Sequence, residues 1–565
     1  MKKIIKTTIL VFMIMLIFSL SSCFFSHVND DNLSLTEKKV EFTNLANSYD
    51  VKDKETKLYY YDGKNVPYID VVEFYKLLDG FYDMSTRNVS INKVFNRLYF
   101  ASSKNNAQRV IFDWKYNTVT FKNTLDVYGQ KSSSTQDFSS YYDTKLVKGI
   151  TRLDIEYYLG DYGFDILYYH DMVLMPLSLV NLIDSVYYNV TYNNDKIYGY
   201  YYDDDLKEVY KTNNVGKNVP NDIIEESKNE LVFLLNEKYG LKEYAKVEDY
   251  RTYLEAYLID YSSGNPDKRD QALIKIIHNI LNDPHSRIDN LGYYSNNQEY
   301  ENSKTYHSAD ERTIKISNVF KDLRGKFKEA ENYNKVIYYK GDTLFLTFDE
   351  FLVGYKNSIY VSDGVYSEDA YLTDTAALFY KAFYETKKNH PEVKNIVIDV
   401  SRNGGGYVAA MFRALTFLST KDVHMAYEVT KDAREIYQLL GDTNMNGSYE
   451  DNDVFDYNYY ILESEGTFSA ANAFTCYAKY SNVAKTIGKR SGGGMCAVMP
   501  YTLADGSVFT LSDRTKMMGV TVVKEGYELH EVESGAPVDI PLEYEDFYDL
   551  DKIVELIHND LQNES

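Results

Sequence analysis

The sequence is short of basic residues, cysteine and tryptophan, and these shortages narrow the range of functions. Its 61 Lys and Arg residues stand against 84 Asp and Glu, which gives a formal net charge of −23 at pH 7. This charge argues against nucleic-acid binding, which rewards basic surfaces, and favours solubility outside the cell. Only three of the 565 residues are Cys and one is Trp, whereas 57 are Tyr. After residue 23 the sequence has no further long apolar run, so we expect the rest of the chain to be soluble and extracytoplasmic.

The N-terminus has the charge and length pattern of a secretory signal peptide. Three lysines within residues 2–6 precede the apolar run 9–18, and the segment closes with Leu20-Ser21-Ser22-Cys23. This ending resembles a bacterial lipobox, which implies cleavage before Cys23 and acylation of its thiol, as by palmitate. The acyl chains would anchor the mature protein to the extracytoplasmic face of a bacterial cell membrane without a spanning helix. An ordinary signal peptide with a chance cysteine is the alternative.

The length predicts three to four domains at ~100–200 residues each, and the 44% of hydrophobic residues supply ample material for their cores. Composition and pattern predict a signal peptide (1–23), a polar tether (24–45), two small α+β repeats (46–125 and 126–205), a linker (206–225), a helical segment (226–340), a mixed α/β segment (341–548) and a C-terminal helix (549–565).

An internal near-repeat distinguishes the first half of the chain. One copy contains segment 65–78 and ends in the strand-like run 110–121, and the other contains segment 173–183 and ends in 186–200. Each copy has the pattern of a strand, a proline, a short amphipathic helix and a hairpin with an Asn/Asp-rich turn. This pattern resembles the stalk-type repeat named after the copper amine oxidase N-terminal domain. The resemblance implies a spacer or binding module rather than catalysis, and no set of copper ligands accompanies it.

Two turns rich in small residues follow strand-like runs in the second half. The apolar run 459–462 leads into segment 465–474, which carries Ser469 and continues into a helical pattern. A serine at such a turn lies near a helix N-terminus, where free backbone N–H groups can stabilise an anion. About 60 residues upstream, the run 396–400 leads into a turn containing Gly404-Gly405-Gly406.

A third glycine loop, 487–494, completes the pattern. In this order the three segments resemble the C-terminal processing (tail-specific) serine protease family, over roughly residues 226–548. The resemblance implies that residues 226–340 form a helical cap of the protease. It implies that residues 341–548 form an α/β catalytic core of the ClpP/crotonase-like kind, with Ser469 as the nucleophile. It also implies an oxyanion hole made by the backbone N–H of Gly405 or Gly406 together with that of Ala470. Such donors can contribute about 3–4 kcal/mol each to transition-state stabilisation.

The general base is where this sequence departs from much of that family. A lysine usually follows the third glycine loop, but Gly494 occupies the aligned position and Lys489 lies too early. The histidine-using, tricorn-like branch carries an upstream Asp-x-His motif, which is matched here by Asp283-Pro284-His285. The apolar spacing of residues 273–281 predicts a helix that Pro284 ends at or before Asp283. His285 would then lie just past the helix.

The chemistry of a serine–histidine pair is coherent with these positions. A serine hydroxyl needs a base within hydrogen-bond reach, and a histidine with an ordinary pKa of about 6.5 suits that role. A histidine base usually needs a carboxylate on its other ring nitrogen. The family resemblance suggests Glu533 for this orienting role, with Glu531 as the fallback.

Each of these residues also has a simpler interpretation. Ser469 alone is typical of a helix N-cap, and the three glycines alone are typical of a turn. His285 alone would be an exposed loop residue, and Glu533 a solvated side chain. Their joint order favours the functional interpretation.

Segment 442–453 has the pattern of a calcium-binding loop. Asp442, Asn444 and Asn446 supply oxygen ligands at positions 1, 3 and 5, Gly447 occupies position 6, and Asp453 closes the loop. Aspartate at the last position resembles the dockerin-type variant. The sequence thus indicates a structural calcium ion, and no cofactor is expected to be required for catalysis. An Asn/Asp/Gly-rich surface loop is the alternative.

Taken together, the sequence predicts a lipid-anchored extracytoplasmic serine endopeptidase that acts through an acyl-enzyme. Its substrate would be protein or peptide in the cell envelope or medium. One rival is a catalytically inactive relative that binds peptides or envelope components, which Gly494 keeps open. Another is a scaffold lipoprotein whose function lies in the N-terminal repeats. Cys476 and Cys496 either pair in an oxidising compartment or remain as two buried thiols.

Overall fold

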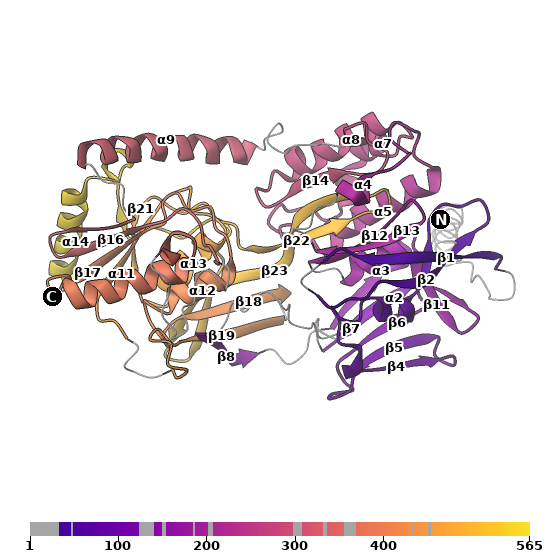
Figure 1. Ribbon diagram of the computed structural model, residues 1–565, viewed down its shortest axis with the longest axis horizontal. Coiled ribbons are helices and arrows are strands. Elements are labelled where there is room, and N and C mark those ends of the chain that lie inside the picture. Colours follow the sequence, from indigo (N-terminus) through magenta and orange to yellow (C-terminus); the bar gives the residue numbers. More distant parts are fainter. Residues whose placement is uncertain are drawn as a thin grey trace, which may run out of the picture.

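The computed structural model describes residues 33–46, 49–123, 141–149, 154–184, 187–201, 207–297, 308–331, 336–354, 369–430, 433–449 and 454–564. These residues form two lobes joined by long strands (Figure 1). The N-terminal lobe, coloured indigo to magenta, holds most elements up to β14. The C-terminal lobe holds α9 and most of the elements that follow it.

A mainly parallel sheet forms the centre of the C-terminal lobe. Its order is β15-β16-β17-β20-β21-β25, and every pair from β16 onward is parallel. The strands are β15 (Ile337–Lys340), β16 (Thr343–Thr347), β17 (Asn395–Asp399), β20 (Asn458–Glu463), β21 (Lys485–Gly488) and β25 (Ile540–Pro541). All five residues of β17 are buried, as expected for a parallel strand covered on both faces.

Helices cover both faces of this sheet. Ile396 and Ile398 of β17 pack with α11 (Thr375–Asn389), α12 (Val408–Leu415) and α13 (Ala470–Tyr480) on one face. Val397 packs on the other face with α9 (Ser308–Glu331) and α14 (Leu550–Glu564). The predicted α/β fold and the C-terminal helix are therefore confirmed.

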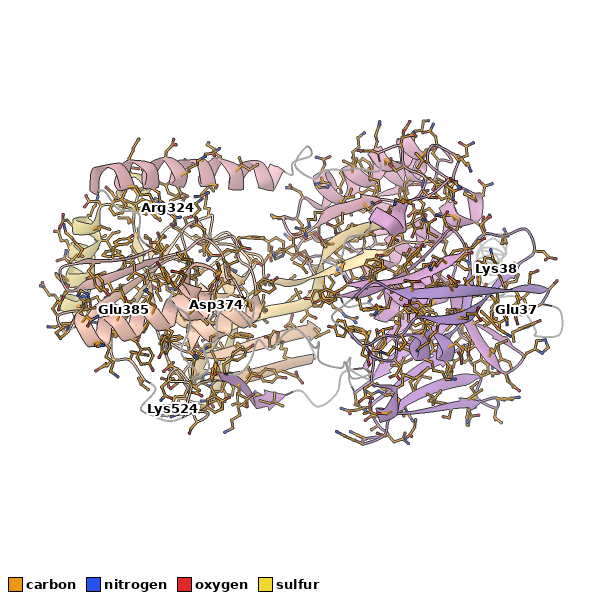
Figure 2. All side chains as sticks on the ribbon, in the orientation of Figure 1. Glu37, Lys38, Arg324, Asp374, Glu385 and Lys524 are labelled. Atoms are coloured by element: carbon orange, nitrogen blue, oxygen red, sulfur yellow. The ribbon has the colours of Figure 1, made fainter. Side chains whose placement is uncertain are left out.

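Helix α9 is fixed to the sheet by a buried cation. Figure 2 labels Arg324 on α9, where the helix lies across the C-terminal lobe. Its guanidinium pairs with Asp349 and, at 3.4 Å, with Asp399 at the end of β17. These partners raise the pKa of Arg324 despite its burial. Because α9 also contacts the glycine turns through Ser317, which accepts from Arg402 Nε at 3.3 Å, it forms one boundary of the region around those turns.

A second sheet spans the two lobes. Its order is β14-β23-β18-β19-β8, and β22 and β24 also pair with β23. The strands are β14 (Arg287–Leu291), β18 (His424–Thr430), β19 (Ala433–Gly441), β22 (Cys496–Thr502), β23 (Ser507–Val523), β24 (Gly526–His530) and β8 (Tyr142–Gly149). Strand β23, 17 residues long, runs from the N-terminal lobe into the C-terminal lobe (Figure 1).

The N-terminal lobe contains two further sheets. The first has the order β10-β11-β3-β2-β1-β13-β12 and the second β4-β5-β6-β7-β9. The first comprises β10 (Leu167–Tyr169), β11 (Met172–Pro176), β3 (Tyr68–Asp70), β2 (Lys54–Tyr61), β1 (Leu35–Asn44), β13 (Lys196–Tyr201) and β12 (Tyr188–Asn193). The second comprises β4 (Arg87–Asn92), β5 (Arg97–Ser102), β6 (Arg109–Asp113), β7 (Thr118–Lys122) and β9 (Asp154–Tyr158).

The near-repeat exists locally but does not form two separate modules. Strand β3 leads into α2 (Val71–Leu77) and β11 leads into α3 (Leu177–Asp184), as the sequence predicts, and β3 pairs with β11. However, β9 of the predicted second unit pairs with β7 of the first, and β8 pairs with β19 of the C-terminal lobe. The boundary at residues 125 and 126 therefore divides strands that share sheets.

Three other predicted boundaries are also wrong. Residues 35–44 of the predicted tether form β1, which pairs with β2 and β13. Residues 207–210 of the predicted linker form α4 (Lys207–Tyr210), and α5 (Asn221–Glu237) begins inside it. The predicted cap is helical, with α6 (Tyr250–Tyr253), α7 (Glu255–Tyr261) and α8 (Pro266–Ile274). It also contains β14 and β15, and its first helices share one hydrophobic core with the N-terminal sheets.

Cys476 and Cys496 are buried free thiols, which settles the choice left open by the sequence. Burial raises the pKa of both groups, so they are protonated and unreactive near neutrality. Within the described residues no helix is long and apolar enough to cross a membrane. The predicted signal peptide and Cys23 lie outside the described residues.

Candidate active site

The three glycine-rich turns meet at one edge of the parallel sheet. They follow the carboxyl ends of β17, β20 and β21, which are adjacent and parallel. Clefts for ligands form at this end of parallel sheets because the connecting loops gather there. Backbone hydrogen bonds join the turns: Phe468 N–H donates to Asn403 O at 3.0 Å, and Ser469 N–H donates to Gly493 O at 2.9 Å.

Ser469 occupies an unusual backbone conformation between β20 and α13. Its φ is 55° and its ψ is −124°, and its side chain makes no capping hydrogen bond to α13. A positive φ in a non-glycine residue costs of order 1–3 kcal/mol and is concentrated at functional sites. The interpretation of Ser469 as a simple N-cap is therefore not supported. The turn instead resembles the strained strand-to-helix turns that expose the nucleophile in other serine hydrolases.

Gly405 and Gly406 of the first turn lie so close to neighbouring atoms that a side chain at either position would clash. At Gly405 (φ 115°) a Cβ would lie 2.8 Å from Ser469 Cβ, and at Gly406 (φ 125°) it would lie 2.3 Å from Phe351 O. The Gly405 N–H donates to Asn403 Oδ1 at 2.9 Å. Because that donor is already engaged, Gly406 is the better of the two predicted oxyanion donors.

Ala470 suits the second donor position. It is the first residue of α13, where the backbone N–H has no acceptor within the helix. Its nitrogen would lie 3.1 Å from a Cβ at Gly405, so the first turn and the helix start face one another beside Ser469. The helix N-terminus adds a favourable field for a developing negative charge.

His285 lies against Phe468 and Gly494. The preceding helix ends as predicted: a π-helical segment (Lys275–Leu281) stops at Asn282, which adopts the left-handed conformation. The His285 ring contacts the Phe468 ring with centroids 4.7 Å apart. A Cβ added to Gly494 would lie 3.1 Å from His285 Cε1. His285 thus adjoins both the residue before Ser469 and the third glycine loop.

The electrostatic environment keeps His285 neutral. Burial is the main cause of its lowered pKa, with Arg287 acting in the same direction and Asp283 opposing it. Its Nε2 is buried and has no hydrogen-bond partner within the described part of the chain. A neutral imidazole with an unused nitrogen is the form that a general base needs. Ser469 and His285 are not hydrogen-bonded to each other in the described residues.

Glu533 does not make the orienting contact that the sequence predicts. Its Oε2 accepts a hydrogen bond from Met495 N–H at 2.8 Å, and among the described residues no hydrogen bond joins it to His285. Burial is the main cause that raises its pKa, to about 7. The fallback Glu531 is exposed.

Two residues not predicted for this role interact with His285. Ser512 Oγ is 3.5 Å from His285 Nδ1, on the neighbouring strand β23. Asp283 accepts from His285 N–H at 3.0 Å and from Ser286 Oγ at 2.6 Å, so it fixes the turn rather than the ring. Asp283 was visible in the Asp-x-His motif, whereas Ser512 carries no local sequence signal because strand pairing alone places it there.

The structure also explains the missing lysine. A Cβ added at Gly494 (φ 86°) would lie 2.8 Å from the Phe468 ring, so a lysine there would displace both Phe468 and His285. Lys489 pairs with Glu543 at 2.6 Å instead. Neither position supplies an amine to Ser469.

The predicted calcium loop is described in part. Asp442 is 2% exposed, and its carboxylate accepts from the backbone N–H of Asn446 and, at 2.7 Å, of Gly447. Asn444 Oδ1 also accepts from Asn446 N–H at 3.0 Å. Asp453 lies outside the described residues, and the described residues contain no cluster of three His, Cys, Asp or Glu side chains suited to a metal. Calcium binding stays a prediction.

Residues 364–517 match the family model described as Peptidase family S41. The matched segment carries all three glycine turns and Ser469, which confirms the resemblance inferred from the sequence and supports a serine peptidase. The chain matches no curated protein.

Among solved structures, the chain is similar to a photosystem II D1 C-terminal processing protease, with 19% identity and a TM-score of 0.26 over 38% of this chain and 46% of that one. The chain thus aligns with less than half of that protease. A lipoprotein from Streptococcus agalactiae shows 12% identity and a TM-score of 0.35 over 60% of this chain and 98% of that one. The tricorn protease shows 16% identity and a TM-score of 0.24 over 42% and 19%.

Proposed function

We propose that this protein is a serine endopeptidase in which Ser469 is the nucleophile and His285 the general base. The observation that carries the proposal is the conformation of Ser469. Its strained turn packs against Gly405. The neutral His285, whose Nε2 has no partner in the described residues, lies against Gly494 of the third glycine loop. Conformational strain at a serine, without a capping bond to offset it, is difficult to explain by packing alone.

The catalytic cycle follows from these positions. His285 takes the proton of the Ser469 hydroxyl as the oxygen attacks the carbonyl carbon of the peptide bond. The N–H groups of Gly406 and Ala470 stabilise the oxyanion of the tetrahedral intermediate. His285 then donates the proton to the leaving amine. Water hydrolyses the acyl-enzyme by the same proton transfers, with water as the nucleophile and Ser469 Oγ as the leaving group. For the serine to reach the base, the two side chains must form the hydrogen bond that the substrate-free site lacks, as is common before substrate binds.

The test is cleavage of an unstructured, fluorescently labelled protein by the chain lacking residues 1–23. Ser469→Ala and His285→Ala should each lower kcat/KM by at least about 10³-fold. Ser534→Ala and His558→Ala, both at exposed positions, should retain the wild-type rate. Because burial lowers the pKa of His285, the acid limb of the pH–rate profile should lie below about pH 6.5.

The same assay separates the rival functions. Glu533→Gln should retain most of the activity, since Glu533 contacts Met495 rather than His285. Equal background cleavage by wild type and both site variants would contradict the proposal. It would favour the inactive relative that binds peptides or envelope components, because that function does not need a hydrogen bond between Ser469 and His285.

We also propose that the protein is held on the extracytoplasmic face of the membrane by acylation of Cys23. The proposal rests on the Leu20-Ser21-Ser22-Cys23 ending and on the strongly acidic composition. Cells producing the full chain should incorporate an alkyne-labelled palmitate into it and retain it in the membrane fraction. Cys23→Ser should abolish the label and release the protein from the membrane fraction, whereas Cys476→Ser should do neither. Labelling of the Cys23→Ser variant at the wild-type level would overturn the assignment.

A further inference from the structure

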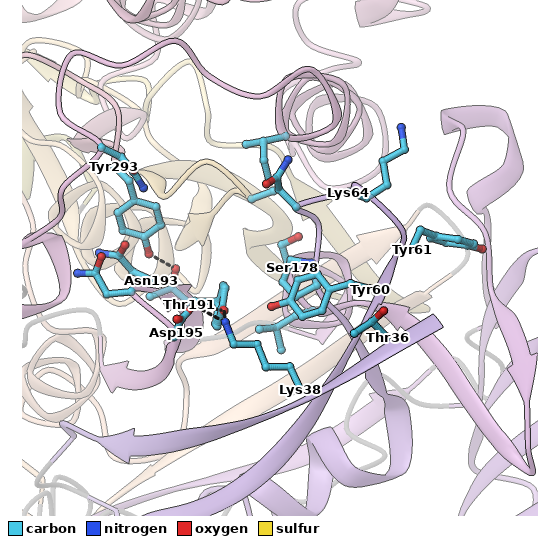
Figure 3. A pocket seen from close by; sticks show the side chains of 18 of the residues that line it. Thr36, Lys38, Tyr60, Tyr61, Lys64, Ser178, Thr191, Asn193, Asp195 and Tyr293 are labelled. Atoms are coloured by element: carbon cyan, nitrogen blue, oxygen red, sulfur yellow. Dashed lines mark hydrogen bonds and ion pairs between the residues drawn. The ribbon is translucent and has the colours of Figure 1, made fainter. Parts of the chain in front are cut away.

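A large cavity in the N-terminal lobe shares no residue with the proposed active site. It has a volume of about 920 Å³, within the roughly 300–1,000 Å³ of small-molecule sites. Its walls come from β1, β2, β12, the start of α3 and the turn between β22 and β23. Figure 3 shows Tyr60 and Ser178 in the middle of this cavity, with Tyr293 on one side and Tyr61 on the other.

The lining of the cavity is polar and aromatic rather than apolar. Five tyrosines and five asparagines contribute to it, along with the hydroxyls of Thr36, Ser178 and Thr191. Tyrosine offers an apolar ring face with a polar tip, and an asparagine amide offers both donors and an acceptor. Such walls match a ligand that alternates C–H faces with many hydroxyl groups. An apolar ligand would leave these groups desolvated without partners.

The charges of the cavity are nearly balanced. Three carboxylates and two ammonium groups line it, and Lys38 Nζ pairs with Asp195 Oδ1 at 2.5 Å. The same carboxylate also accepts from Tyr192 Oη at 3.0 Å. Glu37 pairs with Lys57 outside the cavity at 2.9 Å, so Asp62 and Lys64 remain as one charge of each sign. The cavity therefore has no excess of one sign with which to capture an anion or a cation. The preferred ligand is therefore uncharged.

One polar group in the wall lacks a partner. The Tyr60 hydroxyl is buried and makes no hydrogen bond of ordinary geometry within the described residues, although the Tyr192 hydroxyl is close enough to interact with it. Behind the wall, Glu230 accepts from Ala504 N–H at 2.7 Å, while its other carboxyl oxygen is also unpartnered. Buried polar groups without partners cost free energy, and a hydroxyl-bearing ligand can offset part of this cost.

The cavity does not offer a strand edge to a peptide. Strand β12 is the edge strand of its sheet, but Val190 N–H already donates to Asn181 Oδ1 at 2.8 Å. Asn193 Nδ2 donates to Val209 O at 2.6 Å, which holds α4 against the end of β12. Recognition of an extended peptide by strand addition needs free backbone groups, so side-chain recognition is the mode that remains.

We propose that this cavity binds a neutral oligosaccharide, with tyrosine rings packing against sugar rings and amides and hydroxyls bonding to sugar hydroxyls. The site is independent of the peptidase chemistry. It would hold the protein on a glycan or select substrates that carry one.

The test measures binding by calorimetry with the chain lacking residues 1–23 and carrying Ser469→Ala, which keeps the result separate from peptide hydrolysis. The probes are cellotetraose, chitotetraose and maltotetraose, with tetra-alanine as the peptide of comparable length. At least one oligosaccharide should bind with a Kd of about 1 mM or tighter, which corresponds to about −4 kcal/mol. Tetra-alanine should not bind.

Two substitutions locate the binding in the cavity. Tyr60→Phe removes only the unpartnered hydroxyl, so it should weaken binding by about fivefold, the equivalent of one hydrogen bond, without lowering the melting temperature. Tyr61→Ala removes a ring at the cavity rim and should weaken binding by at least about tenfold, or 1.4 kcal/mol. Tyr116→Ala, at a tyrosine that is 64% exposed elsewhere in the N-terminal lobe, should bind as the parent does. Absence of binding by all three oligosaccharides, binding of tetra-alanine alone, or unchanged affinity in both Tyr60→Phe and Tyr61→Ala would overturn the proposal.

Discussion

At the scale of single residues, the proposed site depends on the absence of a side chain at Gly405. Its backbone lies against Ser469 so closely that a methyl group would meet Ser469 Cβ at 2.8 Å, and its φ of 115° disfavours any side chain. The neighbouring Gly404 is exposed and has no heavy atom within 4 Å of the corresponding position. Two adjacent glycines therefore have different physical roles, and this difference can be measured.

Gly405→Ala should lower kcat/KM by at least about 100-fold, or 2.7 kcal/mol, because the added methyl must displace Ser469. Gly404→Ala should change kcat/KM by no more than about twofold, as is usual for open surface positions. Protein cleavage rates and circular dichroism of both variants provide the comparison. Equal activities for the two folded variants would show that the close approach at Gly405 does not matter to catalysis.

The candidate site could be predicted from sequence where its signals are local. Ser469 and the glycine turns follow apolar strands within a few residues, and the order of the three turns, which resembles that of a known family, singles them out. His285 belongs to a three-residue segment that resembles the Asp-x-His motif of the family's histidine-using branch, and Pro284 indicates that it follows the end of a helix. The neighbours of His285 could not be predicted from such patterns: Ser512 lies 227 residues away and reaches the ring only because β23 pairs with β14. The family resemblance suggests Glu533 as the orienting carboxylate, but its bond to Met495 has no local signal in the sequence.

At the scale of elements, the sequence was least informative where a strand is mostly exposed. Strand β1 buries only Val40 and Phe42, so its polar composition resembles that of a tether. It is a strand because β2 and β13 supply its hydrogen-bond partners, and β13 lies about 150 residues further along the chain. The two near-repeats likewise merge because strands of one copy complete sheets of the other.

The loop after β19 is the element for which we expect a response to calcium. Its Asp442 carboxylate is buried and already holds the loop by accepting from the backbone N–H of Gly447. Extracellular sites of this kind bind calcium with Kd values of about 10⁻⁴–10⁻³ M. Calcium at ten times its Kd should therefore stabilise the folded protein by about 1.4 kcal/mol.

The measurement is the thermal midpoint of the chain lacking residues 1–23, in 5 mM calcium, in 5 mM magnesium and in EDTA. Calcium alone should raise the midpoint by a few degrees, and Asn444→Ala should reduce that rise. A midpoint that is identical in calcium and EDTA would identify segment 442–453 as a surface loop without a bound ion.

At the scale of the whole molecule, several buried carboxyl groups should make the folded protein less stable as pH rises toward 8. Burial raises the pKa of Glu463 and of Glu226 to about 8, and that of Asp270 to about 7. Glu463 ends β20, where the chain enters the turn that carries Ser469, and it is fully buried. Neither of its carboxyl oxygens makes a hydrogen bond of ordinary geometry in the described structure. These groups keep their protons in the folded protein and lose them on unfolding.

The sign of the effect follows from proton linkage. Between the ordinary glutamate pKa of 4.5 and about 8, the folded state binds the Glu463 proton and the unfolded state does not. The free energy of unfolding therefore falls as pH rises through this window, by up to about 1.4 kcal/mol per pH unit for each such group. Carboxylates with lowered pKa values, such as Asp222, oppose this trend only at more acidic pH. Stability should accordingly be greatest near pH 5 and should decline toward pH 8.

The contribution of Glu463 can be isolated with Glu463→Gln, whose neutral amide reproduces the protonated form. Thermal midpoints measured between pH 5 and 8 should fall less steeply with pH for this variant than for wild type, and at pH 8 the variant should be the more stable of the two. Glu465→Gln changes an exposed residue of the same turn and should keep the wild-type slope. If Glu463→Gln instead follows the wild-type slope, the carboxyl group at the end of β20 is ionised in the folded protein. The strained turn that follows it would then begin at a buried negative charge, which would oppose the oxyanion that the proposed mechanism requires.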